Sequence, residues 1–286
     1  MAELNVVKVT KDVVYGQGGG RDLRLDCYEP GENRLGTAVI LIHGGGWNRG
    51  ERGQLAEHAR FLANEGFTAL SIEYRLTGES PFPGMIHDVK AAIRWVRKNA
   101  AMLQIDPANI CLQGHSAGAH LALLAAGTPN APRFDAPNVD ISISTTVAAV
   151  AAVYPPVRFH VGDDRPSGSL PARHLFGDSA TAEMAELASP ITHVTPNFPP
   201  TFLTHGDIDK VVPFSASLRM WETLRAAGVP VDAQLHAGLP HGFASMPEVL
   251  PALMASTSAF FRRHVAQKEQ FQASLAARAA ATAPAR

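Results

Sequence analysis

The sequence predicts a single α/β domain in which helices cover both faces of a mostly parallel sheet. The first observation is "TAVILIH" (37–43), a continuous apolar run that is typical of a strand buried on both faces. The second is that strand-like and helix-like segments take turns after this run, which favours right-handed crossover connections. The third is the length of 286 residues, which suffices for one large core, and no linker-like segment divides it.

The individual elements follow from hydrophobic periodicity and from the positions of glycine and proline. Before the buried strand, three short runs read as leading antiparallel strands, and in the third of them Leu23, Leu25 and Cys27 alternate with charged residues. These runs are "NVVKVT" (5–10), "DVVYG" (12–16) and "DLRLDCYEP" (22–30). Further strands are expected at 67–74, 108–114, 146–155, 200–206 and 231–238. Helices are expected at 52–66, 83–103, 116–126, 213–228 and 247–265.

Two segments interrupt this alternation. Residues 155–200 are rich in proline, glycine and charge and are too long for a plain connection, so we expect a short lid inserted into a domain that spans 1–264. Residues 265–286 contain helix-forming residues without a sustained apolar face. This tail is therefore expected to be a frayed helix or a disordered segment.

The composition is that of an ordinary globular protein. Hydrophobic residues make up 46% and charged residues 18%, and the formal net charge is −1, so nucleic acid and anionic membranes exert no general electrostatic attraction. The first residues lack a basic segment followed by an apolar one, and no uninterrupted apolar run reaches membrane-spanning length, which predicts a cytoplasmic location. Cys27 and Cys111 lie in strand-like stretches and are expected to be buried thiols.

The segment "CLQGHSAGAHLALLAAG" (111–127) places Ser116 between Gly114 and Gly118, where a strand-like run gives way to a helical one. This is the strand-turn-helix setting of the G-x-S-x-G nucleophile elbow, in which glycines are needed because Cβ atoms would clash in so sharp a turn. The alternative for the pentapeptide alone is a serine that caps a helix in an unrelated α/β protein. A nucleophilic serine needs a base and a group that orients the base, so the presence of these partners decides between a nucleophile and a helix cap.

The oxyanion site is predicted from "HGGGW" (43–47), directly after the buried strand. Successive glycines let backbone N–H groups point at a developing negative oxygen, and Gly45 and Gly46 are the expected donors, together with Ala117 at the start of the serine helix. A nucleotide site is the alternative for a glycine run, but no G-x-G-x-x-G spacing or Walker lysine accompanies it.

The acid and the base are predicted from the ends of two late strands. "THGDIDKVVP" (204–213) offers two carboxylates, of which Asp209 is expected to orient a histidine and Asp207 to stabilise the turn. His241, in the loop after the last strand, is the expected base, with His205 and His236 as rivals. The chain order of serine, acid and histidine is the order of nucleophile-elbow enzymes.

With these motifs the chain resembles the α/β-hydrolase superfamily, and within it bacterial esterases of the hormone-sensitive-lipase and acetylxylan/feruloyl esterase-like (BD-FAE-like) groups. The resemblance covers most of residues 37–262 and rests on "HGGGW" (43–47), "EYRL" (73–76), "PFPGMIHDVKAAIRWVRKNA" (81–100), "DPANICLQGHSAGAHLA" (106–122), "SPITHV" (189–194), "PPTFLTHGDIDKVVP" (199–213) and "LPHGF" (239–243). It implies an α/β-hydrolase fold, a Ser116-Asp209-His241 triad and no cofactor. Lipase-type relatives usually carry a helical N-terminal cap, whereas residues 1–42 read as strands, which leaves 155–200 to shape the pocket.

The expected activity is hydrolysis of short-chain or aryl carboxylic esters of small molecules through an acyl-enzyme. An arylformamidase-type amidase is the alternative within enzymes, because such proteins resemble this chain at the elbow and the glycine loop, and a non-catalytic binding protein of the same fold is the alternative outside them. No metal is expected, since His115 and His120 do not form an H-E-x-x-H pattern. Trp47 and His115 are expected beside the substrate, with core packing as the alternative for Trp47. The resemblance also leaves a homodimer open.

Overall fold

Eight strands form one sheet, and a separate pair of short strands lies in the 155–200 insertion. A computed structural model describes residues 7–137, 139–163 and 165–282. The sheet strands are β1 (Lys8–Gly18), β2 (Arg21–Glu29), β3 (Ala38–Ile42), β4 (Thr68–Ile72), β5 (Ile110–His115), β6 (Ala149–Val153), β9 (Thr201–Gly206) and β10 (Val231–His236). The separate pair is β7 (Arg158–His160) and β8 (Ser169–Pro171).

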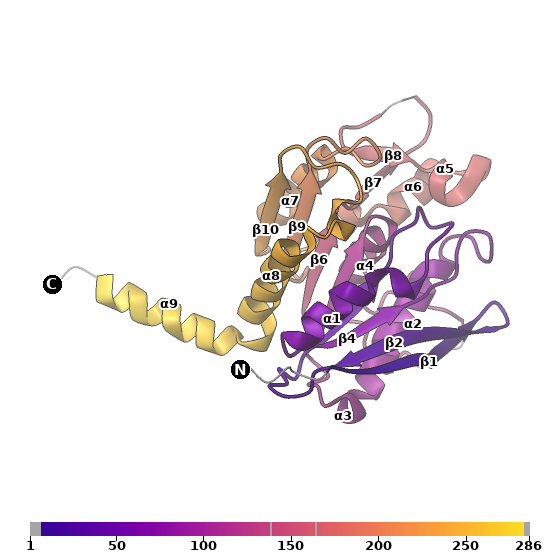
Figure 1. Cartoon of the computed structure of the whole chain (residues 1–286). Coiled ribbons are helices and arrows are strands. Elements are labelled where there is room, and N and C mark those ends of the chain that lie inside the picture. Colours follow the sequence, from indigo (N-terminus) through magenta and orange to yellow (C-terminus); the bar gives the residue numbers. More distant parts are fainter. Residues whose placement is uncertain (1–6, 138, 164, 283–286) are drawn as a thin grey trace.

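The sheet order is β1-β2-β4-β3-β5-β6-β9-β10, in which only the first two pairings are antiparallel. The helices are α1 (Ala56–Asn64), α2 (Gly84–Lys98), α3 (Ala100–Leu103), α4 (Ala117–Gly127), α5 (Arg173–Phe176), α6 (Ala182–Ala188), α7 (Ser215–Ala226), α8 (Leu250–Phe261) and α9 (Lys268–Thr282). The predicted α/β architecture with a mostly parallel sheet is therefore confirmed (Figure 1).

Helices cover both faces of the sheet, as the continuous apolar strands predict. In β3, Ile40 and Ile42 belong to the apolar core under α2, α4 and α7, whereas Val39 and Leu41 belong to the core under α1 and α8. All four side chains are fully buried, because successive residues of a strand point to opposite faces. A strand in this position has no polar face to expose, which explains the uninterrupted apolar run.

Two predictions of element boundaries differ from the structure. The runs at 5–10 and 12–16 belong to one strand, β1, whose pairing with β2 shifts between Thr10 and Val13, where Asp12 has a φ of 61°; residues 5 and 6 lie outside the described part of the chain. The helix expected at 83–103 divides into α2 and α3 around Asn99. Local periodicity does not reveal a bulge or a one-residue break, because the hydrophobic pattern continues across both.

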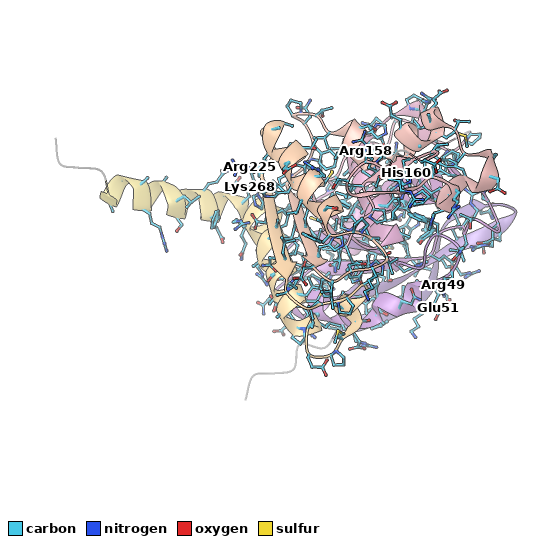
Figure 2. The ribbon with its side chains drawn as sticks, turned by 90° about the horizontal axis from the view of Figure 1, so that it is seen from above. Arg49, Glu51, Arg158, His160, Arg225 and Lys268 are labelled. Carbon is cyan, nitrogen blue, oxygen red and sulfur yellow. The ribbon has the colours of Figure 1, made fainter. Side chains whose placement is uncertain are left out.

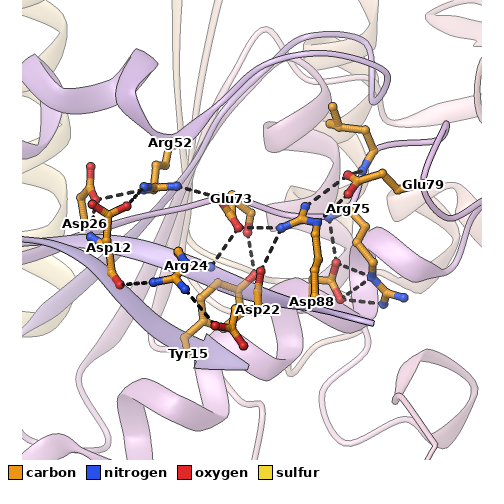
Figure 3. Close-up of polar contacts among 12 residues, drawn as sticks. Asp12, Tyr15, Asp22, Arg24, Asp26, Arg52, Glu73, Arg75, Glu79 and Asp88 are labelled. Carbon is orange, nitrogen blue, oxygen red and sulfur yellow. Dashed lines mark hydrogen bonds and ion pairs between the residues drawn. The ribbon is translucent and has the colours of Figure 1, made fainter. Parts of the chain in front are cut away.

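A network of charged side chains fastens the leading strands to the turn that enters α1. Arg52 belongs to a 3-10 turn, Arg52–Leu55, and its guanidinium binds Asp12, Asp26 (3.0 Å) and Glu73 (2.6 Å), as Figure 3 shows. These three carboxylates come from β1, β2 and the segment after β4. The network therefore positions the turn, part of which reaches the cavity described below.

The insertion and the tail lie at different places on the body. The insertion contains β7, β8, α5 and α6, and it lies at the top of Figure 1 beside the loops that follow the strands. After α8 the chain forms a π-helical turn, Arg262–Ala266, and α9 then projects away from the sheet with its described side chains exposed. Within the described residues, no helix combines the length and the apolar character that crossing a membrane requires. Cys27 and Cys111 are buried and unpaired, as predicted.

Candidate active site

Ser116 lies in a sharp turn between β5 and α4. Its φ of 53° and ψ of −117° are unfavourable for a residue with a Cβ, which is the backbone strain expected at a nucleophile elbow. The flanking glycines are required by space, since a Cβ on Gly114 would lie 2.2 Å from the carbonyl oxygen of Gly118, and a Cβ on Gly118 would lie 2.1 Å from that of Ile42. The turn thus holds the hydroxyl at the end of the sheet.

The structure brings the predicted serine, histidine and acid into one hydrogen-bonded chain. The Ser116 hydroxyl lies 2.9 Å from His241 Nε2 and can donate to it, and His241 Nδ1 donates to Asp209 Oδ2 at 2.6 Å. Ser116 and His241 are 125 positions apart in the chain. These distances are within the range in which a histidine can remove a proton from a hydroxyl.

Asp209 is held by four donors and its side chain is fully buried. Its Oδ1 accepts the backbone N–H groups of Val211 (2.8 Å) and Val212 (2.9 Å), and its Oδ2 accepts from His241 and from His205 Nε2 (3.2 Å). Burial raises the pKa of this carboxyl, but the hydrogen bonds outweigh it and hold the pKa of Asp209 well below its ordinary value. The group therefore stays ionised and can orient the imidazole.

The rival residues have other partners. His205 Nε2 also donates to the carbonyl oxygen of Val212 at 3.0 Å, so this histidine supports the acid and lies away from the serine. His236 Nε2 lies 2.8 Å from the hydroxyl oxygen of Thr204. Asp207 accepts the backbone N–H of Gly238 at 2.7 Å, which is the turn-stabilising contact that the sequence indicates.

The glycine loop forms a turn beside the serine. Gly45 and Gly46 have φ values of 121° and 60°, and the carbonyl oxygen of Gly45 accepts from the N–H groups of Asn48 and Arg49. Among the described residues, the N–H groups of Gly45 and Gly46 have no backbone acceptor. Ala117 is the first residue of α4, where a helix leaves its N–H groups free to bind an anion. Gly45 and Gly46 thus line the same cavity as Ser116, Ala117 follows the serine directly, and their role as oxyanion donors stays a prediction.

A cavity of about 510 Å³ contains the serine and the histidine. Its walls come from the glycine loop, the turn before α1, the ends of β5 and β6, the insertion, and the loops after β9 and β10. The lining residues are Gly44, Gly45, Gly46, Trp47, Arg49, Gln54, Leu55, His58, His115, Ser116, Tyr154, Pro156, Leu170, His174, Val211, Val212, His241, Gly242 and Ser245.

Trp47 and His115 both line this cavity, but each is nearly buried, at 2% and 5% exposed. Trp47 donates its indole N–H to His120 Nδ1 at 3.1 Å and packs its ring near Phe159, so most of this side chain serves the core. His115 Nε2 lies 3.2 Å from Gln113 Nε2, and burial lowers the pKa of His115 well below its usual range. Both side chains therefore leave only a small part of their surface to a ligand in the cavity.

Tyr154 is a site residue that the sequence analysis does not single out. It follows β6, has a φ of 41°, and places its ring 4.5 Å from the His241 ring. Its position directly after an apolar strand, on the same sheet edge as Ser116, is the signal that points to it. His58, by contrast, comes from the first turn of α1, and no local pattern connects it with the cavity.

Comparison with known proteins then decides the family. The BD-FAE family model matches residues 25–224. The chain belongs to the BD-FAE family. The BD-FAE match spans the glycine loop, the serine elbow and the insertion, and ends before His241.

Two relatives of this BD-FAE protein that match most of the chain are named as ester hydrolases. It is 36% identical to the probable carboxylic ester hydrolase LipM of Mycobacterium tuberculosis, over 80% of this chain and 54% of that protein. It is 34% identical to the esterase LipQ of the same organism, over 81% of this chain and 56% of LipQ. The chain thus spans little more than half the length of these relatives.

Solved structures give the name of the fold. Thermogutta terrifontis esterase 2, phosphonylated by sarin, is similar with a TM-score of 0.78 and 26% identity, over 91% of this chain and 96% of that one. A truncated carbohydrate esterase from gut microbiota has the same TM-score with 28% identity, over 92% of this chain and 98% of that one. The fold of this BD-FAE protein is the α/β-hydrolase fold.

Proposed function

We propose that this protein is a serine carboxylesterase that hydrolyses esters of small molecules through an acyl-enzyme. The observation that carries the proposal is the hydrogen-bonded chain from Ser116 through His241 to Asp209, which opens into a cavity beside two glycines. The names of the relatives support an ester as the bond that is cleaved. The structural neighbour that is phosphonylated by sarin is an esterase that reacts with an organophosphate.

In the proposed first step, the Ser116 oxygen attacks the ester carbonyl carbon while His241 Nε2 takes the hydroxyl proton. Asp209 holds Nδ1–H of the ring and stabilises the imidazolium that forms. The carbonyl oxygen becomes negative and accepts hydrogen bonds from the N–H groups of Gly45, Gly46 and Ala117. His241 then gives its proton to the leaving alcohol as the carbon–oxygen bond breaks, and the acyl group stays on the serine.

In the second step, water attacks the acyl-enzyme with His241 as the base, and the carboxylic acid leaves. Neither step of this mechanism uses a cofactor or a metal. That the protein needs neither remains a prediction, as do a homodimer and a cytoplasmic location.

The test is the substitution Ser116→Ala assayed with p-nitrophenyl acetate and p-nitrophenyl butyrate. We expect kcat to fall by about 10⁴-fold or more, with an unchanged circular dichroism spectrum, because the nucleophile is removed while a small residue remains in the turn. A fluorophosphonate probe should label the natural protein and leave the variant unlabelled. An aryl formamide assayed beside the esters compares the amidase alternative directly, and near-normal ester hydrolysis by Ser116→Ala would exclude the scheme.

A further inference from the structure

The wall of the active-site cavity carries a permanent positive charge. Among the described residues that line it, Arg49 is the one with a permanent charge, and none of them is an aspartate or a glutamate. Burial lowers the pKa of His58 to about 4 and that of His115 well below its usual range, so these two rings are neutral near pH 7. The fixed charge at the wall of the cavity is therefore positive.

A second hollow, of about 580 Å³, continues from the same wall. It shares Gly45, Gly46, Arg49 and His174 with the active-site cavity, and it adds another guanidinium, that of Arg173 from α5. Its remaining lining residues are Asn48, Gly177 and Asp178. The two hollows thus meet at the proposed oxyanion turn, with an arginine on the glycine loop and another on the insertion.

Arg49 is held against this turn by its own backbone and stem. A Cβ placed on Gly45 would lie 2.0 Å from the carbonyl oxygen of Arg49 and 3.2 Å from its Cγ, so the arginine stem passes directly beside that glycine. The loop geometry that frees the glycine N–H groups therefore also directs Arg49 along the mouth of the cavity.

Neither arginine is neutralised within the described part of the chain. No ion pair is found there for Arg49 or Arg173, whereas Arg52 and Arg75 each hold at least one carboxylate within 3.0 Å. Three described acids lie near these arginines in the chain or share a hollow with them: Glu51, which Figure 2 labels beside Arg49, Asp178, and Asp163, which lines a third hollow with Arg173. Glu51 lines neither hollow, and Asp178 lines only the outer one.

We propose that Arg49, assisted by Arg173, selects esters that carry a carboxylate several bonds from the reacting carbonyl. A guanidinium offers a planar pair of N–H donors that matches a carboxylate, and an unpaired arginine can make this contact without first breaking another ion pair. This inference rests on the proposed esterase function and adds the chemical class of its substrate. Because both side chains are solvent-exposed, the expected preference is modest, roughly three- to tenfold in kcat/KM.

The test compares two esters with the same leaving group, mono-p-nitrophenyl adipate and p-nitrophenyl hexanoate. They share a six-carbon acyl chain whose end is a carboxylate in one ester and a methyl group in the other, so the ratio of their kcat/KM values reports how the protein recognises that end group. We expect Arg49→Gln to lower the adipate-to-hexanoate ratio roughly three- to tenfold and Arg173→Gln to lower it less. Arg225→Gln, an exposed arginine on α7 far from the cavity lining, is the matched control and should leave the ratio unchanged.

Salt supplies an independent readout. Raising sodium chloride from 20 to 300 mM should reduce the ratio for the natural protein and change it little in Arg49→Gln, because exposed charges are screened. An equal loss on both esters in Arg49→Gln, or an unchanged ratio, would overturn the proposal and leave Arg49 with a packing role. Failure of the natural protein to hydrolyse the hexanoate, p-nitrophenyl butyrate and p-nitrophenyl acetate alike would instead refute the proposed esterase function, so the two failures are distinguishable.

Discussion

The substitution Asp209→Asn tests the proposed triad most sharply, because the contacts fix which way the new amide must lie. Oδ1 of Asp209 accepts two backbone N–H groups, from Val211 and Val212, and these donors cannot change roles. The asparagine oxygen is therefore required at this position, and its NH₂ group must face His241 Nδ1. That arrangement favours the tautomer with the proton on Nε2, which can no longer accept the proton of Ser116.

The expected loss in kcat is about 10⁴-fold, the effect of a wrong histidine tautomer in a serine triad, which corresponds to about 5.5 kcal/mol of transition-state stabilisation. The NH₂ group would also face Nε2–H of His205, which bonds the carbonyl oxygen of Val212 as well as Oδ2 of Asp209. Two donors would then face each other, and the bond from His205 to residue 209 would be lost. Asp207→Asn is the control, since an asparagine oxygen can still accept the N–H of Gly238. Single-turnover and steady-state rates with p-nitrophenyl acetate should be measured for both variants and for the natural protein. Activity within tenfold of normal in Asp209→Asn, or a larger loss in Asp207→Asn, would refute the reasoning.

Two further predictions concern the glycine loop and the buried histidines. Gly45→Ala should reduce kcat by about a hundredfold or more, because the added Cβ overlaps the carbonyl oxygen of Arg49 and displaces the proposed oxyanion donor. Gly78→Ala is the control, because a Cβ at Gly78 meets open space, and it should leave kcat unchanged in the same assay. Burial lowers the pKa of His58 and of His120 to about 4, so the unfolded chain binds protons below about pH 6.5 that the folded chain does not. Stability present at neutral pH is therefore lost as the pH falls from 6.5 towards 4, by about 2 kcal/mol for each histidine between pH 7 and 5, and urea unfolding at the two pH values should show it. His58→Gln should show a smaller loss between the same pH values, and an equal loss in both proteins would contradict the assignment.

The sequence predicts the fold well because most parallel strands are buried on both faces, the exception being the edge strand β10. Strands such as β3 and β6 have no polar residue within them, and the intervening helices begin or end at proline or glycine. The serine, the acid and the histidine could be located for a related reason. Each follows a strand, and the carboxyl ends of parallel strands meet at one edge of a sheet, where such folds bind ligands.

The walls of the cavity could be predicted much less completely. His58 reaches the cavity from the first turn of α1, and Leu170 and His174 reach it from the insertion, whose path is set by packing against the body and has no periodic pattern. From the sequence, a place in the core and a place in the lining of the substrate pocket are equally compatible with Trp47. The indole N–H bond to His120 decides that most of this ring packs in the core, and no property of the tryptophan's neighbours in the chain indicates a partner 73 positions away.

The order of the strands explains why Tyr154 belongs to the site although it carries no triad role. Ser116 follows β5 and Asp209 follows β9, and β6 lies between these two strands in the sheet. Neighbouring strands are about 4.8 Å apart, so the serine and the acid cannot meet directly and the histidine must bridge the end of β6. Tyr154 stands at that end, with its backbone N–H bonded to Thr204 and its ring 4.5 Å from the ring of His241. The aromatic ring therefore fills the space under the bridging imidazole, which a small residue would leave open.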